Sequence, residues 1–435
     1  MDPTTLVAIA FCVFAFGLVS HRVEGTPLTA PMVFAAIGLL GGPFGLDLIH
    51  VEGETTDIII EVTLVLVLFS DASRIRLREL RRGYRLPARL LAFGMPLTIG
   101  LGTVLAWPFF PDLTWAELAL LAAVLTPTDA ALGQVVVSSP RVPVRIRQTL
   151  NVESGLNDGI AVPVVMVLLA AAATGHMPAT ESGHGSEGGG IGFAIAQIGL
   201  GPVAGFMVAC PAGWLVQRAV KTNSINHVYE HFAGLAIAIG AFGVAELIGG
   251  NGFIAAFTAG LVIGNTKESV CKGLQEFAED EGQLLALIAF LVFGATMLPP
   301  AMEALDWPVA LYIGLSLTVV RMVPVALALL GSGLRMPSVA FLGWFGPRGL
   351  ATILFGLLVS EATGVPNHER LVHIITLVVA ASTLAHGLSA APFAAAYGRW
   401  VKRSCEPEGS ECQPAPELPV RIRLREQRAA GRTAQ

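Results

Sequence analysis

Four polar side chains stand close together at the head of one apolar stretch, NVESGLNDGIAVPVVMVLL, which covers residues 151–169. They are Glu153, Ser154, Asn157 and Asp158. At about 100° per residue on a helix, Ser154 and Asp158 share one face, and Glu153 and Asn157 share the face beside it. A carboxylate and a hydroxyl supply the oxygen ligands that a hard cation prefers, and a carboxylate taken out of water binds a proton more readily. The pattern predicts a buried site that takes either a cation or a proton.

The composition places these residues in a membrane. The 435-residue chain is 54% hydrophobic and only 14% charged, whereas soluble domains carry about a quarter charged residues. The formal net charge of −5 suggests no nucleic-acid partner. The five cysteines show no metal-ligand spacing, so no cofactor is expected, and Cys405 and Cys412 are interpreted as free thiols.

Apolar windows of about 20 residues predict an all-α membrane protein with about thirteen transmembrane helices. The expected spans are 4–20, 28–44, 56–71, 88–108, 114–138, 149–174, 191–217, 228–248, 251–266, 282–300, 306–330, 337–360 and 371–396. If the first span ends inside and sides then alternate, nearly all lysines and arginines fall inside, as the positive-inside rule requires. The N-terminus is therefore expected outside and the C-terminus in the cytoplasm. The chain start lacks a basic region before its apolar residues, which favours a retained span over a signal peptide.

Two segments lie outside this pattern. The outer loop at 175–190 has no lysine or arginine, and its glycines predict flexibility. Residues 401–435 are expected to form a poorly ordered cytoplasmic tail after a membrane domain of residues 1–400. The basic end of the tail could touch anionic lipid.

Two spans contain helix breakers at corresponding places. The fifth span contains AVLTPTDAAL, where Pro127 precedes Asp129, and the twelfth contains GWFGPRGLAT, where Pro347 precedes Arg348. Proline removes a backbone donor and glycine loosens the turn, so both helices should be interrupted near mid-bilayer. The freed helix ends need compensating charges, and Asp129 and Arg348 carry one of each sign. The two spans run in opposite directions, so spans 4–6 and 11–13 can form the inverted repeat of a secondary transporter. Proline-kinked helices without transport are the alternative.

Buried charges must be paired or neutralised. Arg348 is the expected partner of Glu153, with Asn157 bridging the pair, and this leaves Asp158 to titrate. Asp71 ends the third span beside the basic segment RIRLRELRR, where an ion pair at the cytoplasmic surface is the simpler interpretation. The remaining ionisable residues expected within spans are Glu61, Glu246, Glu361 and Arg321.

Several segments together resemble the monovalent cation/proton antiporters, in the branch shared by bacterial sodium/proton antiporters and eukaryotic sodium/proton exchangers. They are TPTDAAL, NVESGLNDGIAVPVV, NGFIAAFTAGLVIGN, FLVFGATMLP, RMVPVAL and WFGPRGLAT. The resemblance covers roughly residues 4–396. It implies a homodimer of thirteen-span protomers in the cell membrane, with two discontinuous helices that cross near the ion site. The core domain would comprise roughly residues 84–175 and 306–396, and the other helices would form the dimerisation domain.

The resemblance also implies roles for the ion site. Asp158 would be the carboxylate that binds cation or proton, with Ser154 and Thr128 as neighbouring ligands. Asp129 would support the unwound crossing.

Further residues would support the site from outside it. Glu153, Arg348 and Asn157 would form the structural ion pair. His386 matches a histidine near the family's last span, where packing is expected. Many relatives place an acidic residue directly after the Leu-Phe of the third span, whereas LFSDAS carries its acid one position later, so Asp71 is only an accessory candidate.

A single titrating carboxylate predicts electroneutral exchange of one cation for one proton. Sodium is the expected cation, and a potassium/proton antiporter of the same superfamily is the nearest alternative. A cation channel is a further alternative, although the sequence shows no filter-like repeat.

Enzyme functions fit less well. HVYEH at residues 227–231 matches the H-x-x-E-H pattern of zinc proteases, but it begins an apolar span and has no evident third ligand. An aspartyl protease could pair Asp129 with Asp158, yet that chemistry has no use for Arg348 or for the two broken helices. The chain is therefore not expected to be an enzyme.

Overall fold

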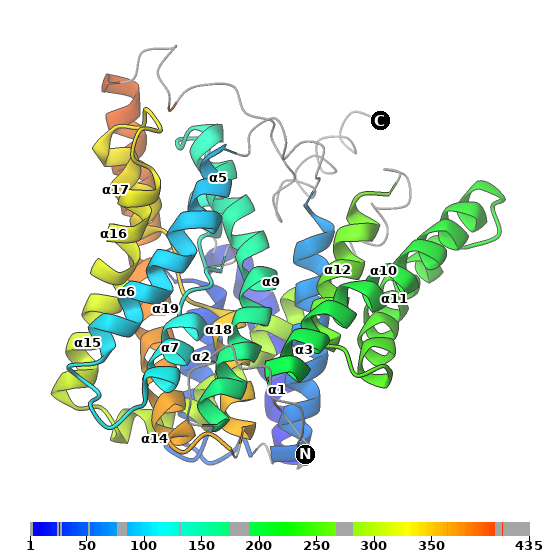
Figure 1. Ribbon diagram of the computed structural model, residues 1–435, viewed down its shortest axis with the longest axis horizontal. Helices are drawn as coiled ribbons and strands as arrows, with labels where there is room; N and C mark the ends of the chain where they lie inside the picture. The colour runs from blue at the N-terminus through cyan, green and yellow to red at the C-terminus, as the bar shows by residue number, and fades with distance from the viewer. Residues whose placement is uncertain are drawn as a thin grey trace.

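The computed structural model describes residues 3–23, 26, 28–50, 53–75, 85–129, 132–174, 191–266, 282–362, 364–404 and 411. Within these ranges every regular element is a helix (Figure 1). In the first half they are α1 (Pro3–Val23), α2 (Ala30–Gly41), α3 (Gly53–Ser73), α5 (Arg85–Arg89), η1 (Leu90–Gly94), α6 (Met95–Ala106), α7 (Trp115–Val124), α8 (Gln134–Val137) and α9 (Val144–Thr174). In the second half they are α10 (Ile191–Lys221), α11 (His227–Leu247), α12 (Gly252–Gly264), a helix over residues 282–292 that continues into η2 (Phe293–Met297), α14 (Leu298–Glu303), α15 (Trp307–Leu317), α16 (Val319–Ala328), α17 (Met336–Trp344), α18 (Leu350–Glu361) and α19 (His368–Ser404).

The all-α membrane architecture is confirmed, although the number of crossings is not. In the described part of the chain, eight helices are long and apolar enough to cross a membrane, and four shorter apolar helices accompany them. Each of the thirteen expected spans coincides with one helix or with consecutive helices. The fifth and twelfth spans are interrupted as predicted: α7 and α8 flank the first break, and α17 and α18 flank the second. The eleventh span is also divided, at Thr318 between α15 and α16.

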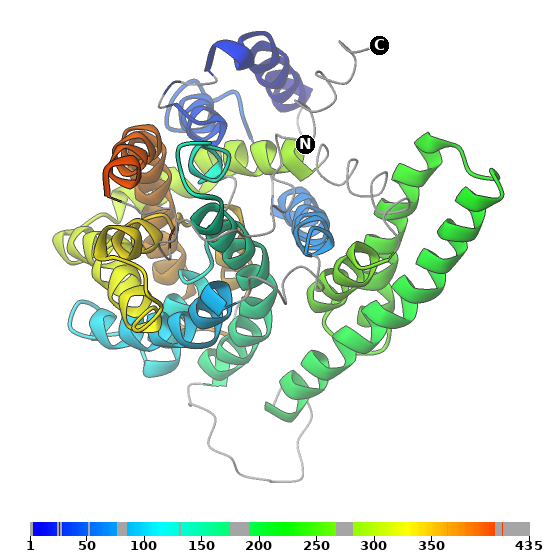
Figure 2. The ribbon, with the colours of Figure 1, turned by 90° about the horizontal axis from the view of Figure 1, so that it is seen from above.

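The helices form two groups. Figure 2 shows α10 and α11 as an outlying pair beside α12 and α3, and α12 packs against all three. The α5–α9 segment and the α15–α19 segment pack against each other on the other side. The two interrupted helices belong to this second group, so the carboxylates of α9 lie within a frame made by both halves of the chain.

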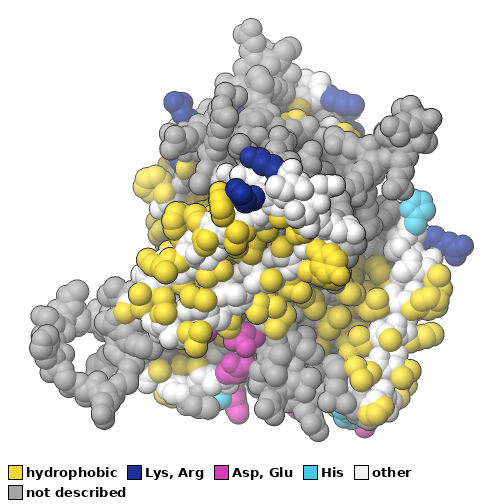
Figure 3. All heavy atoms as spheres, turned by 90° about the vertical axis from the view of Figure 1, so that its right-hand side faces the viewer, with side chains coloured by type: hydrophobic (Ala, Val, Ile, Leu, Met, Phe, Trp, Pro, Cys, Tyr) yellow, Lys and Arg dark blue, Asp and Glu magenta, His cyan; other side chains and the backbone are white. Residues whose placement is uncertain are grey.

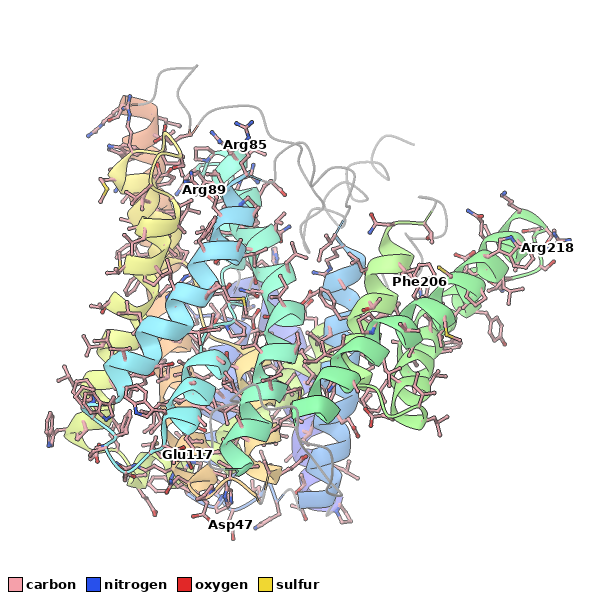
Figure 4. All side chains as sticks on the ribbon, viewed as in Figure 1. Asp47, Arg85, Arg89, Glu117, Phe206 and Arg218 are labelled. Carbon is pink, nitrogen blue, oxygen red and sulfur yellow. The ribbon has the colours of Figure 1, made fainter. Side chains whose placement is uncertain are left out.

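Charge is distributed unequally between the two ends of the helices. In Figure 4, Arg85, Arg89 and Arg218 lie toward one end of the protein, and Asp47 and Glu117 lie at the other. Between such ends, Figure 3 shows a face covered largely by hydrophobic side chains. The outward residues of α10 in this region are Val203, Phe206, Met207, Trp214 and Leu215. An apolar face between two charged ends agrees with a helix bundle in a bilayer.

The start of α7 is fixed at the acidic end. The Thr114 side chain accepts the Glu117 N–H, and the Glu117 carboxylate accepts the Thr114 N–H at 2.8 Å, which is a capping box. The same carboxylate, fully buried, accepts the Asn367 N–H at 3.0 Å just before α19. The interrupted helix is thus attached at its outer end to the last helix of the chain.

The last helix is longer than the expected span. α19 continues to Ser404, beyond the predicted end at residue 396. Glu411 of the tail is buried, and its carboxylate accepts the Arg335 N–H at 2.8 Å and the Ser338 hydroxyl at 3.2 Å at the start of α17. The rest of the predicted tail, Cys405 and Cys412, and the outer loop at 175–190 lie outside the described residues.

Candidate cation-binding site

The two breaks meet each other inside the protein. α7 ends at Val124 and α17 ends at Trp344, each followed by an irregular segment that contains the predicted proline. The Asp129 N–H donates to the Pro347 carbonyl over 2.7 Å, which joins the first irregular segment to the second. Two stretches more than 200 residues apart in sequence therefore form one unwound region.

The charged residues of the breaks cap each other's helices. The Asp129 carboxylate accepts the Leu350 N–H at 2.9 Å, so it lies at the N-terminus of α18. The Arg348 Nε–H donates to the Leu125 carbonyl over 3.1 Å at the C-terminal end of α7. Negative charge at a helix N-terminus and positive charge at a C-terminus are both favourable. Each interrupted helix thus receives its compensating charge from the other one.

Two glycines make this approach possible. A Cβ on Gly349 would collide with the Asp129 carboxylate, and a Cβ on Gly346 would come within 2.5 Å of the Arg321 guanidinium. The glycines in GWFGPRGLAT are therefore needed for close contact with two charged side chains, besides loosening the helix.

The polar residues of α9 contact the first break directly. The Ser154 hydroxyl donates to the Thr128 carbonyl over 2.5 Å, and the Asn157 amide donates to the Thr128 hydroxyl over 2.7 Å. Asp158 follows Asn157 on the same uninterrupted helix and is 5% exposed. The structure therefore brings together Thr128, Ser154 and Asn157, and the buried Asp158 follows one helical turn after Ser154 on α9.

The predicted pairing of Glu153 with Arg348 is wrong. Glu153 forms an ion pair with Arg321 of α16, with 2.6 Å between the Glu153 Oε1 and the Arg321 Nη2 atoms. Both side chains are only 3% exposed. Asn157 does not bridge this pair, because its amide is directed to Thr128. Arg321 is the arginine of the RMVPVAL segment. The sequence places both Arg321 and Arg348 within spans, and it does not indicate which of them contacts Glu153.

The Arg348 guanidinium donates its hydrogen bonds to backbone carbonyls. Besides Leu125, its guanidinium donates to the Ser316 carbonyl over 2.7 Å and to the Gly346 carbonyl over 3.4 Å. Its backbone N–H donates to the Ser382 hydroxyl of α19 over 2.7 Å. The end of α7 and the last turn of α15, just before the break at Thr318, provide these carbonyl oxygens, so the fully buried guanidinium is stabilised by aligned dipoles.

Asp71 lies at the margin of the site. It ends α3 as predicted and lies 3.7 Å from Arg74, so its ion pair is with the adjoining turn. Its backbone approaches α9 at Gly155, next to Ser154. A part for Asp71 in the ion path stays a prediction.

A small cavity adjoins the meeting point of the breaks. Its walls include three of the predicted site residues, Thr128, Asp129 and Ser154, and the remaining lining is Gly133, Val136, Val137, Leu150, Phe345 and Pro347. The apolar part of the lining comes from α8, from the start of α9 and from the end of α17.

A zinc site at HVYEH receives no support from the described residues. The side chain of His227 is outside them, and no group of three or more His, Cys, Asp or Glu residues within them is arranged to hold a metal ion. Thr128, Ser154 and Asp158 carry oxygen atoms, which are the ligands that hard cations prefer.

Two interrupted helices that meet beside buried carboxylates define the class of protein, a secondary transporter. Residues 7–396 match the family described as "Sodium/hydrogen exchanger, transmembrane". The chain belongs to this family.

Individual relatives agree with this assignment. The "K(+)/H(+) antiporter NhaP" of Alkalimonas amylolytica is 26% identical over 403 residues, which are 92% of this chain and 66% of that protein. The "Na(+)/H(+) antiporter NhaP" of Pseudomonas aeruginosa is 26% identical over 400 residues, which are 85% of this chain and 89% of that protein. The chain spans slightly less than two thirds of the length of the potassium/proton relatives that it matches.

Solved structures show the same fold. The sodium proton antiporter MjNhaP1 from Methanocaldococcus jannaschii at pH 8 aligns with a TM-score of 0.66 and 20% identity, covering 92% of this chain and 98% of that one. A second structure of MjNhaP1, from electron microscopy, aligns with a TM-score of 0.72 and 19% identity, covering 94% and 100% of the two chains.

Proposed function

We propose that this protein is a secondary antiporter that exchanges a monovalent cation for a proton across a membrane. The single observation that carries the proposal is the buried cluster on α9, where Ser154 and Asn157 contact Thr128 at the break and Asp158 lies beside them. Asp158 binds the cation or the proton, and Ser154 and Thr128 contribute further oxygen ligands. Asp129 holds the break in place. No cofactor is needed, because the same carboxylate serves both substrates.

Competition at one carboxylate produces obligatory exchange. A bare carboxylate in a low-dielectric interior is costly, and binding of either a cation or a proton removes that cost. The site therefore changes its exposure between the two sides only when it is loaded. We place the basic end of the protein in the cytoplasm and the N-terminus outside.

Sodium is the proposed cation, and potassium is the second candidate. The relative from Pseudomonas aeruginosa is named for sodium/proton exchange, and the one from Alkalimonas amylolytica for potassium/proton exchange. Both ions accept the oxygen ligands at Thr128, Ser154 and Asp158. We further propose a homodimer in the cell membrane, in which the helices outside the core group supply the contact.

Proton movement in proteoliposomes tests the proposal. Vesicles with a trapped pH-sensitive dye and an acidic interior should become alkaline inside when sodium or potassium is added outside. The response should saturate with cation concentration, because the ion binds a finite site. Flux that ignores the pH gradient would instead indicate a channel, and protein-free vesicles serve as the control.

Exchange is expected to be electroneutral. Asn157 and Asp158 precede Gly159, so this position offers one titrating carboxylate. One cation then crosses for one proton, and no net charge moves. Solid-supported membrane recordings at equal pH on both sides should show no sustained cation-evoked current, whereas a current that reverses with an imposed voltage would contradict the one-for-one stoichiometry.

A further inference from the structure

One turn of α19 holds both sides of the second break. The His386 Nε2 atom lies 2.8 Å from the Trp344 carbonyl, at the C-terminal end of α17. The Ser382 hydroxyl accepts the Arg348 N–H at 2.7 Å, just before α18 begins. Ser382 and His386 are four residues apart, so they face the break from the same side of α19.

The histidine is built into this position. Its side chain is fully buried, and its ring lies 5.1 Å from the Trp344 indole ring. The Nδ1 atom lies 2.8 Å from the Ser382 carbonyl and 3.2 Å from the Ser382 hydroxyl. Both ring nitrogens are therefore occupied by protein groups.

The protonation of the imidazole ring decides which contacts of His386 are donated and which are accepted. A neutral ring donates through one nitrogen and accepts through the other. We assign the ring proton to Nε2, so that the ring donates to the Trp344 carbonyl and Nδ1 accepts from the Ser382 hydroxyl. In the other tautomer Nδ1–H would donate to the Ser382 carbonyl, 2.8 Å away. The Ser382 hydroxyl in turn accepts the Arg348 N–H. The chain of contacts runs from one side of the break to the other through α19.

We propose that Ser382 and His386 are positioning residues for the cation site. This inference rests on the proposed function. His386 holds the Trp344 carbonyl, and Ser382 fixes the Arg348 backbone. Together they set the path of the Phe345–Pro347 segment, which lines the cavity and accepts the Asp129 N–H. The two residues thereby determine where Asp129 and Thr128 stand relative to Asp158.

The inference predicts an effect on cation affinity. In His386→Ala the Trp344 carbonyl loses the imidazole donor and keeps the Gly346 N–H. The break then relaxes, and the oxygen ligands around the ion spread. Loss of one neutral hydrogen bond corresponds to a rise in the apparent KM for sodium or potassium of roughly five- to tenfold. His386→Gln should restore most of the affinity, because a glutamine amide can donate to the same carbonyl. Ser382→Ala should raise the KM in the same direction.

The experiment compares these variants in proteoliposomes. Apparent KM, maximal rate and the pH profile are measured for the wild type, His386→Ala, His386→Gln and Ser382→Ala. His373→Gln is the matched control, because His373 lies on the same helix more than two turns away. Thermal unfolding of each variant in detergent shows the extent to which the fold is affected.

The outcomes separate three cases. A raised KM in His386→Ala, with rescue and an unchanged pH profile in His386→Gln, supports positioning. An unchanged KM in His386→Ala overturns it, and so does a fall in maximal rate that only follows the folded fraction. Loss of a titration step in His386→Gln also overturns it, since it would make the ring a proton carrier. If the wild type exchanges neither cation for protons, the proposed function fails independently of these comparisons.

Discussion

We expect Asp158→Asn to abolish cation-driven proton movement in proteoliposomes while the protein stays folded. Asparagine has nearly the same shape as aspartate, but it neither binds a proton near neutral pH nor offers a negative charge to a cation. Asp158 is 5% exposed and lies next to the contacts of Ser154 and Asn157 with Thr128. Such a buried ionisable group marks the ion pathway. The measurement is the dye response to sodium and to potassium, normalised to the amount of reconstituted protein.

Asp47→Asn is the matched control for this result. Asp47 is exposed near the acidic end of the protein and pairs with His50, so its loss should leave exchange intact. The unfolding midpoint of Asp158→Asn should be equal to or above that of the wild type, since a buried charge has been removed. Exchange at the wild-type rate in the asparagine variant would refute the role of Asp158 and with it the proposed mechanism.

Arg321→Ala should be the most destabilising substitution at the site. The arginine pairs with Glu153 in a place where both side chains are 3% exposed. Removing it leaves a buried carboxylate without its partner, and breaking a buried ion pair costs about 3–5 kcal/mol. Thermal unfolding in detergent and the yield of monodisperse protein measure this loss. Arg348→Ala is predicted to act differently, because it removes the cap of α7 and leaves the Glu153–Arg321 pair in place.

A double variant tests whether charge is the cause. Glu153→Gln combined with Arg321→Met removes both charges while keeping similar volume, and such replacements of buried ion pairs are often near neutral. Its stability should exceed that of Arg321→Ala. If the double variant is as unstable as the single one, packing of the arginine rather than stranded charge explains the loss.

Local signals predicted the framework of this protein. Hydropathy placed the helices, and the proline and glycine residues in TPTDAAL and GWFGPRGLAT placed the two breaks, because both signals act within a few residues. Spacing on α9 put Ser154 and Asp158 on one face. The ends of long helices were less certain, since α19 continues past residue 396 with polar residues that hydropathy does not count.

Partner choice could not be predicted in the same way. Glu153 had two arginines to choose from, and selecting Arg321 requires knowing how α16 packs beside α9. Arg348 pairs with carbonyls at the end of α7, which exist only because that helix is interrupted. The contact of Ser382 with Arg348 could not be predicted, because serines are common within apolar helices and nothing in the sequence distinguishes this one. These contacts depend on the meeting of distant segments, which one sequence does not encode locally.

The exchange of caps between Asp129 and Arg348 has a consequence for recombination between relatives. The carboxylate that completes α18 is encoded 221 residues away, and the guanidinium that completes α7 is encoded 223 residues away. A hybrid gene that takes one half from a relative without the matching acid or base would leave one helix dipole uncovered in the interior. Successful hybrids should therefore inherit Asp129 and Arg348 from the same parent. In a library of crossovers selected for salt tolerance, the two codons should be inherited together.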